Sequence, residues 1–145
     1  MTTKSLVKHF MTRNPVTVSE STSVLEARTL MRDRKIRRLL VVDDQLVVGI
    51  LTLGDLRGVH AEEAIGPGMR ASVLMHENPI TVTPETTLRQ AAMIMVEKKV
   101  SGLPVVTDGV LVGIITESDL FRALIEHETD ALDPQPIGVV EGDAF

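Results

Sequence analysis

The sequence predicts a mixed α/β (α+β) fold in which two β-α-β-β-α units pack sheet to sheet with pseudo-two-fold symmetry. The first observation is an internal repeat. Displaced by 64 positions, residues 11–57 align without a gap on residues 75–121, and 19 of 47 positions are identical. The second observation is that each copy combines segments of helical apolar spacing with short β-branched runs. One copy alone is too small for a stable core, so the two copies must share one.

The elements follow the same order in both copies. An Asn-Pro turn, at Asn14 and again at Asn78, precedes a short extended segment. A capping box then opens the first helix, as Ser23-x-x-Glu26 and as Thr87-x-x-Gln90. Two apolar runs at hairpin distance come next, and a second helix ends the unit. The predicted strands are 16–18, 39–42, 46–51, 80–82, 103–106 and 110–115, and the second helices open near 54–55 and 118–119.

We divide the chain into four segments on this basis. They are a first repeat over 5–60, a linker over 61–71, a second repeat over 72–128 and an acidic tail over 129–145 that we expect to be flexible. The Gly-Pro-Gly at 66–68 predicts a turn inside the linker.

The composition restricts the classes of function. A formal net charge of −5 disfavours a general nucleic-acid binder, and the absence of cysteine excludes disulfides and thiol nucleophiles. No apolar run approaches the ~20 residues that a membrane helix needs, and the first residues lack a signal peptide, so we expect a cytoplasmic protein with no membrane partner. The four histidines show no metal-ligand spacing, and no catalytic motif is present. We therefore expect no resident metal and no enzymatic activity.

Three pairs of matching stretches resemble a tandem pair of CBS domains. They are "MTRNPVTV" with "MHENPITV", "IRRLLVVDD" with "VSGLPVVTD", and "GILTLGDL" with "GIITESDL". The resemblance covers roughly residues 5–127. It implies regulatory clefts between the repeats for adenosine-containing ligands, such as AMP, ADP, ATP or S-adenosylmethionine and sometimes NAD or a dinucleotide. It also implies a homodimer that acts on another protein.

The third pair of stretches contains Thr-x-x-Asp at the start of a helix, as Thr52 with Asp55 and as Thr116 with Asp119. One interpretation is structural, because Asp is favourable beside the free N–H groups and the positive dipole of a helix start. The other follows from the resemblance, in which this Asp contacts the ribose of the ligand. A carboxylate has two oxygens that can accept from the two hydroxyls of a ribose.

Arg37 and Arg38 enter the first strand of the first hairpin, where the second copy has Ser101 and Gly102. They are either solvated charges on a strand edge or phosphate ligands, a role for which the guanidinium fork is suited. The resemblance favours the phosphate role, because the regulatory gamma subunit of AMP-activated kinase has phosphate-contacting residues in a similar stretch. We expect two unequal clefts, and the sequence does not decide which Asp shares a cleft with the arginines.

Aliphatic residues must hold the base, because the chain has no Trp and no Tyr. The resemblance places the base against the extended segments after Pro15 and Pro79 and against the strand entries. Ordinary strand packing is the alternative for all of these positions. The candidates are Val16, Thr17, Ile36, Ile80, Thr81 and Val100.

Two functions stay open at this point. The first is a regulatory module that senses an adenosyl ligand and, without a fused output domain, acts in trans or through its own oligomerisation. The second is a dimerisation or scaffold module whose clefts no longer bind a ligand. The Thr and Asp present in both copies favour the first.

Overall fold

The computed structural model describes residues 5–57 and 68–127, and these form the two predicted units. The first unit comprises β2 (Thr17–Val18), α1 (Val24–Arg34), β3 (Arg38–Asp43), β4 (Leu46–Thr52) and α2 (Leu53–Arg57). The second comprises α4 (Leu88–Lys98), β6 (Gly102–Thr107), β7 (Val110–Thr116) and α5 (Glu117–His127), with a bridge from Val82 to Val105 in place of β2. Short elements lead into each unit: η1 (Val7–His9) and β1 (Thr12–Arg13), then α3 (Ala71–Leu74) and β5 (His76–Glu77).

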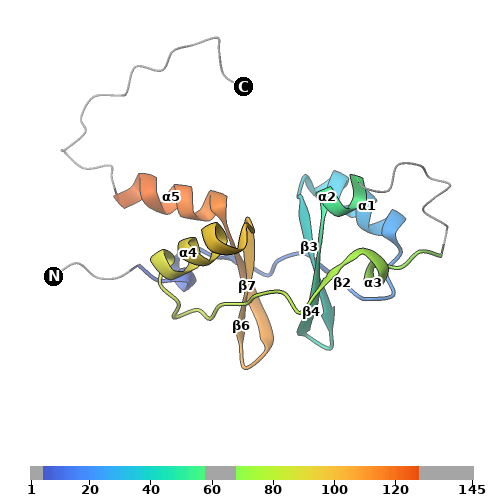
Figure 1. The fold of residues 1–145 in the computed structure, drawn as a ribbon, viewed down its shortest axis with the longest axis horizontal. Coiled ribbons are helices and arrows are strands. Elements are labelled where there is room, and N and C mark those ends of the chain that lie inside the picture. Colours follow the sequence, from blue (N-terminus) through green and yellow to red (C-terminus); the bar gives the residue numbers. More distant parts are fainter. Residues whose placement is uncertain (1–4, 58–67, 128–145) are drawn as a thin grey trace, which may run out of the picture.

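The two hairpins lie toward the middle of the molecule, and the helices flank them on the outer sides (Figure 1). In each hairpin the strands are antiparallel, β3 with β4 and β6 with β7. A bridge between Leu46 and Val110 joins β4 to β7. The predicted fold class, two α/β repeats that meet through their sheets, is confirmed. The predicted tail over 129–145 and most of the predicted linker over 61–71 lie outside the described residues.

Both hairpins close with a two-residue turn of the same conformation. The φ angles are 50° at Asp44 and 71° at Gln45 in the first turn, and 52° at Asp108 and 82° at Gly109 in the second. Two central residues with positive φ define a type I′ turn, whose twist matches that of the strands. Asp and Gly adopt this conformation readily, which explains why short turns form here.

The first helix of each unit begins and ends in the same way. Ser23 Oγ accepts from the Glu26 N–H at 3.0 Å, and Thr87 with Gln90 forms a complete reciprocal capping box. Each helix ends at a lysine in the left-handed conformation, Lys35 at φ 55° and Lys99 at φ 57°. This conformation ends the helix and turns the chain sharply toward the strand that follows.

The segment that leads into each unit packs on the other unit. Val7 is fully buried in the core of the second unit, and Ala71 is fully buried in the core of the first. In the same sense β1 pairs with β7, and β5 pairs with β4. The two repeats are therefore interleaved, and neither core is complete without a segment from the other repeat.

This exchange explains the glycine that begins "GILTLGDL" and "GIITESDL". A Cβ on Gly113 would lie 2.9 Å from the Thr12 carbonyl oxygen, and one on Gly49 would lie 3.2 Å from the His76 carbonyl oxygen. Each glycine is thus the point where the exchanged strand crosses closely over the hairpin, and any side chain there would push that strand away.

Candidate functional site

Two clefts lie between the repeats, and they are related by the pseudo-symmetry. We call them the Thr52 cleft, of about 390 Å³, and the Thr116 cleft, of about 350 Å³. Both volumes are in the range of small-molecule sites. The Thr52 cleft is lined by Arg38, Ile50, Thr52, His76, Asn78, Pro79, Ile80, Lys99, Val100, Ser101, Gly102 and Leu103. The Thr116 cleft is lined by Thr12, Asn14, Pro15, Val16, Lys35, Ile36, Arg37, Arg38, Leu40, Ile114 and Thr116.

Each cleft combines the Thr of one repeat with the leading segment and strand entry of the other. Thr52, from the first repeat, shares its cleft with Ile80 and Val100 from the second. Thr116, from the second repeat, shares its cleft with Val16 and Ile36 from the first. The clefts are therefore composite sites that exist only when both repeats are folded and packed together.

Thr-x-x-Asp forms a reciprocal cap at the start of each second helix. Thr52 N–H donates to Asp55 Oδ2 at 2.7 Å, and the Asp55 N–H donates to Thr52 Oγ1 at 3.2 Å. In the second repeat the matching distances are 2.8 Å and 3.4 Å, and Thr116 Oγ1 also donates to Asp119 Oδ2 at 3.0 Å. This is the geometry of a capping box with Asp in the place of Glu. One oxygen of each carboxylate thus has a structural role.

The second oxygen of each carboxylate binds a basic side chain. His76 Nε2 lies 2.7 Å from Asp55 Oδ1 and comes from β5 of the other repeat, whereas Arg122, on the same helix as Asp119, donates to Asp119 Oδ1. The Asp55 side chain is 16% exposed and that of Asp119 is 1% exposed. Neither carboxylate lines a cleft directly; the threonines and His76 do.

Arg38 lies at the pseudo-symmetry axis and lines both clefts. Its side chain crosses over Gly102, its own counterpart, where an added Cβ would lie 3.1 Å from Arg38 Cδ, and it donates to Ser101 Oγ. Burial lowers the pKa of Arg38 below its ordinary value; the nearby Arg37 lowers it further, whereas the carboxylates of Glu117 and Asp119 oppose the shift. The absence of a side chain at Gly102 therefore leaves room for the side chain of Arg38.

The clefts carry different basic residues. The Thr116 cleft has Lys35, Arg37 and Arg38, whereas the Thr52 cleft has Lys99, Arg38 and His76. Arg37 thus lines the Thr116 cleft, whereas Arg38 lines both clefts. The two lysines sit at equivalent helix ends, so the difference between the clefts comes from the arginines and from His76.

The comparison with known families agrees with this geometry. The family model described as the CBS domain matches residues 7–62 and 71–126. This chain belongs to the CBS domain family. The resemblance that the sequence motifs indicate is thereby confirmed.

Relatives of this CBS pair include longer proteins. This chain is 40% identical over 113 residues to an inosine-5'-monophosphate dehydrogenase of Korarchaeum cryptofilum. The aligned region covers 77% of this chain and 23% of the relative. It is 32% identical over 143 residues to an uncharacterized protein of Methanocaldococcus jannaschii, covering 87% of this chain and 33% of that protein. The chain thus spans between about a quarter and a third of the curated relatives it matches.

Solved structures of similar size also resemble this CBS pair. A structure of CBSX2 in complex with AMP superposes with a TM-score of 0.78 at 34% identity, covering 85% of this chain and 98% of the other. The CBS domain pair of protein MJ0100, in complex with 5'-methylthioadenosine and S-adenosyl-L-methionine, gives a TM-score of 0.78 at 28% identity, covering 87% and 100%. CBSX2 from Arabidopsis thaliana gives 0.79 at 31% identity, covering 89% and 100%.

The structure brings most of the predicted site residues of this CBS pair to the clefts, with two kinds of exception. Asp55 and Asp119 lie one helical turn behind the lining threonines, as described above. Thr17 and Thr81 line neither cleft, because alternate residues of an extended segment point to opposite sides and their neighbours Val16 and Ile80 face inward. Cleft residues that the sequence analysis did not single out include Asn14, Asn78, Lys99, Ser101 and His76.

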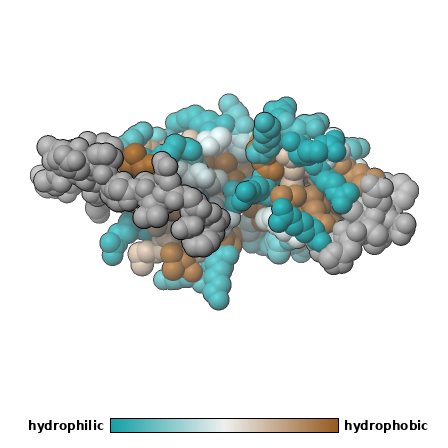
Figure 2. All heavy atoms as spheres, turned by 90° about the horizontal axis from the view of Figure 1, so that it is seen from above, coloured by the Kyte–Doolittle hydropathy of each residue, from teal (hydrophilic) through white to brown (hydrophobic). Residues whose placement is uncertain are grey.

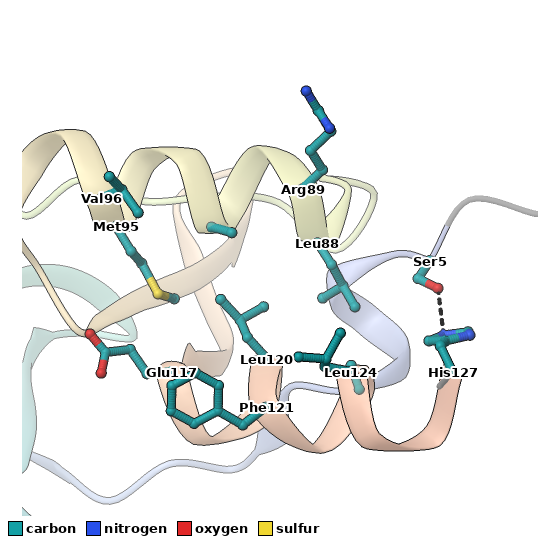
Figure 3. Close-up of a pocket in the computed structure, with 12 residues that line it drawn as sticks. Ser5, Leu88, Arg89, Met95, Val96, Glu117, Leu120, Phe121, Leu124 and His127 are labelled. Carbon is teal, nitrogen blue, oxygen red and sulfur yellow. Dashed lines mark hydrogen bonds between the residues drawn. The ribbon is translucent and has the colours of Figure 1, made fainter. Parts of the chain in front are cut away.

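A third feature of the CBS pair is an apolar groove between α4 and α5, away from both clefts. Figure 3 shows Leu88 and Met95 on α4 pointing toward Leu120 and Leu124 on α5, with Phe121 beside them. Phe121 is 61% exposed. Ser5 Oγ and His127 Nε2, 2.8 Å apart, close one end of the groove. Elsewhere apolar residues reach the surface between hydrophilic ones, as seen from above in Figure 2.

Two further findings concern the described part of the chain. None of its helices has the length and apolar character that crossing a membrane requires. Within 5–57 and 68–127 no group of three or more His, Asp or Glu side chains is arranged to hold a metal ion.

Proposed function

We propose that this CBS pair is a regulatory, non-catalytic module that binds an adenosyl ligand in the Thr52 and Thr116 clefts. The ligand is AMP, ADP, ATP or S-adenosylmethionine. Binding changes the contacts of the module with another protein or with a second copy of itself. A ligand shifts such an assembly only as far as it binds one state more tightly than the other.

The observation that carries the proposal is that largely equivalent positions of the two repeats line both clefts. Apolar side chains, Ile80 with Val100 and Val16 with Ile36, provide flat walls for a purine. A threonine at a helix start with a carboxylate directly behind it provides acceptors for a ribose. A lysine and an arginine in each cleft provide the charge that a phosphate requires. Base, sugar and phosphate thus each meet a suitable surface.

The neighbours support the ligand class. One similar structure is a complex with AMP, and another is a complex with 5'-methylthioadenosine and S-adenosyl-L-methionine. These ligands share an adenosine moiety and differ in the group at the ribose 5' position. The inosine monophosphate dehydrogenases are much longer than the matched region, so their activity is not carried over to this chain.

The direct test is a calorimetric titration of the purified protein with AMP, ATP and S-adenosylmethionine. The chain has no Trp and no Tyr, so an absorbance peak at 260 nm in the purified protein would also reveal a copurified nucleotide. We expect the wild type to bind these compounds. Asp55→Asn should weaken the binding, because the amide has one acceptor oxygen where the carboxylate has two. Asp44→Asn, in an exposed turn, is the matched control. Absence of binding at millimolar ligand, or binding that Asp55→Asn and Asp119→Asn both leave unchanged, would refute the proposal.

The second candidate function is a ligand-free dimerisation module. Two observations favour it: the apolar groove between α4 and α5, and the fact that both carboxylates already have hydrogen-bond partners. It predicts a stable dimer whose association constant does not change with any adenosyl compound. Measuring the association constant with and without saturating AMP separates the two functions.

A further inference from the structure

One interaction in the Thr52 cleft has no counterpart in the other. His76 belongs to β5 of the second repeat, lines the cleft, and binds the Oδ1 atom of Asp55 from the first repeat at 2.7 Å. The position equivalent to His76 in the Thr116 cleft is Thr12, which has no ring nitrogen to offer. Asp119 instead receives Arg122 from its own helix, and the equivalent of Arg122 in the first repeat is Gly58.

The atom that His76 binds is the one a ribose would need. Asp55 Oδ2 already accepts the N–H of Thr52 in the helix cap, so Oδ1 is the oxygen that the cap leaves open to a ribose hydroxyl. The imidazole lines the cleft whereas the carboxylate does not, so a ligand that enters meets the ring before it meets Oδ1. The His76 side chain is 65% exposed, and its rotation into solvent meets little obstruction.

We infer that His76 is a selectivity residue of the Thr52 cleft, which occupies the sugar-binding oxygen of Asp55 in the free protein and must be displaced when a ribose binds. This inference rests on the proposed function. The apparent affinity of a cleft falls by the fraction of molecules in which it is open. His76 thereby makes the Thr52 cleft bind a phosphate-free adenosyl compound more weakly than its lining alone would.

The same contact also ties the two repeats together. Asp55 lies on α2 of the first repeat, and His76 lies on the exchanged strand of the second, so its displacement releases a link across the cleft. The Arg122–Asp119 pair lies within one helix and links no repeats. Occupation of the Thr52 cleft therefore loosens the junction of β5, whereas occupation of the Thr116 cleft leaves that junction intact.

The test replaces His76 by the residue that the other cleft has. Adenosine is titrated into wild type, His76→Thr and the control Glu77→Gln, an exposed change on the same strand. Binding is followed by NMR at Ile80 for the Thr52 cleft and at Val16 for the Thr116 cleft. We expect His76→Thr to tighten binding at Ile80 about threefold to fivefold, the size that a single hydrogen bond contributes, with Val16 and the control unchanged. An unchanged or weaker affinity at Ile80 would overturn the inference.

A second measurement examines the contact without any ligand. The ring resonances of His76 are compared between the free wild type and Asp55→Asn. A change shows that the two side chains meet in solution, whereas identical spectra would overturn the inference whatever binds. If the ring resonances respond but neither Ile80 nor Val16 shifts with adenosine, AMP or S-adenosylmethionine, the proposed function has failed while the His76–Asp55 contact stands. The two failures are thus distinguishable.

Discussion

The aspartate of Thr-x-x-Asp performs a structural task in both repeats, whether or not it also binds a ribose. Asp119 accepts the N–H and the hydroxyl of Thr116 and a guanidinium N–H from Arg122, and it is almost fully buried. Asp55 accepts a hydrogen bond from the Thr52 N–H and one from the His76 imidazole, and its side chain is more exposed than that of Asp119. Removing the carboxylate therefore leaves more donors without a partner in the second repeat than in the first, and the carboxylate removed there is the more deeply buried one.

This difference predicts unequal effects on stability. We expect Asp119→Ala to lower the free energy of unfolding by about 3 kcal/mol, combining a lost cap with unsatisfied buried donors. Asp55→Ala loses mainly the cap, which is worth about 1 kcal/mol. Urea denaturation followed by far-UV circular dichroism measures both. Equal losses in the two variants would contradict the assignment of Asp119 as the more deeply integrated residue.

At this scale the sequence predicted residue types better than it predicted partners. Thr52, Thr116, Arg37 and Arg38 all line clefts. The two threonines belong to a motif that both repeats carry, whereas the arginines stand where the second repeat has Ser101 and Gly102 and were singled out by their charge and by the family resemblance. The partner of Asp55 was not predictable, because His76 is 21 positions away and reaches it only through the exchange of a strand. No local pattern distinguishes such a histidine from a solvated one.

At the scale of elements, the exchange of leading segments determines how the clefts are built. η1 buries Val7 in the second core, and α3 buries Ala71, the counterpart of Val7, in the first. The hairpins and their turns follow from local patterns, and β3, β4, β6 and β7 match the predicted strands to within one residue at either end. The strand predicted over 80–82 is wrong, because the structure has only a bridge from Val82 to Val105 there. The exchange of the leading segments does not follow from the sequence, because no local pattern around Val7 indicates which of the two cores it joins.

The exchange predicts that a change in the first repeat weakens the second. Val7→Ala should lower the free energy of unfolding by about 1–2 kcal/mol, because it leaves a cavity in the core. The loss of hydrogen-exchange protection should appear in α4 and β6 and leave α1 unaffected. His9→Ala, exposed on the same short helix, is the control and should change stability by less than about 0.5 kcal/mol. Loss of protection in α1 instead would contradict the observed packing.

At the scale of the whole molecule, the apolar groove favours association with a second copy. Met93, Val96, Phe121, Leu124 and Ile125 are each about half exposed or more, and all lie on α4 or α5. Arg89, at the start of α4, and Glu117, at the start of α5, add one charge of each sign to the lining of the groove. An interface that is the same patch on both subunits is the commonest arrangement of soluble dimers.

We therefore expect a homodimer that Phe121→Glu dissociates, because the change would place two buried charges at the centre of the interface. Val73→Glu is the matched control, since Val73 is equally exposed, at 65%, but lies on α3. Sedimentation equilibrium should show at least a tenfold weaker dimer for Phe121→Glu alone. A monomeric wild type, or equal effects of the two changes, would show that this groove is not the dimer interface.

From the position of Arg38 we expect the two clefts of one molecule to depend on each other. A single guanidinium at the axis lines both clefts, and its counterpart Gly102 provides no second one. A phosphate in one cleft that draws Arg38 toward itself removes that donor from the other. Adenosine has no phosphate and makes no such demand, so the coupling should depend on the charge of the ligand.

We accordingly expect AMP to bind the second cleft about threefold to tenfold more weakly once the first is occupied, which corresponds to a coupling free energy of about 0.7–1.4 kcal/mol. Adenosine should fill the two clefts independently. Arg38→Gln should weaken AMP binding in both clefts and abolish the coupling, because neither cleft then competes for the cation. Two-site titrations followed at Ile80 and Val16 measure all three quantities in one experiment. Coupling of the same size with adenosine, or coupling that persists in Arg38→Gln, would place its origin elsewhere in the molecule.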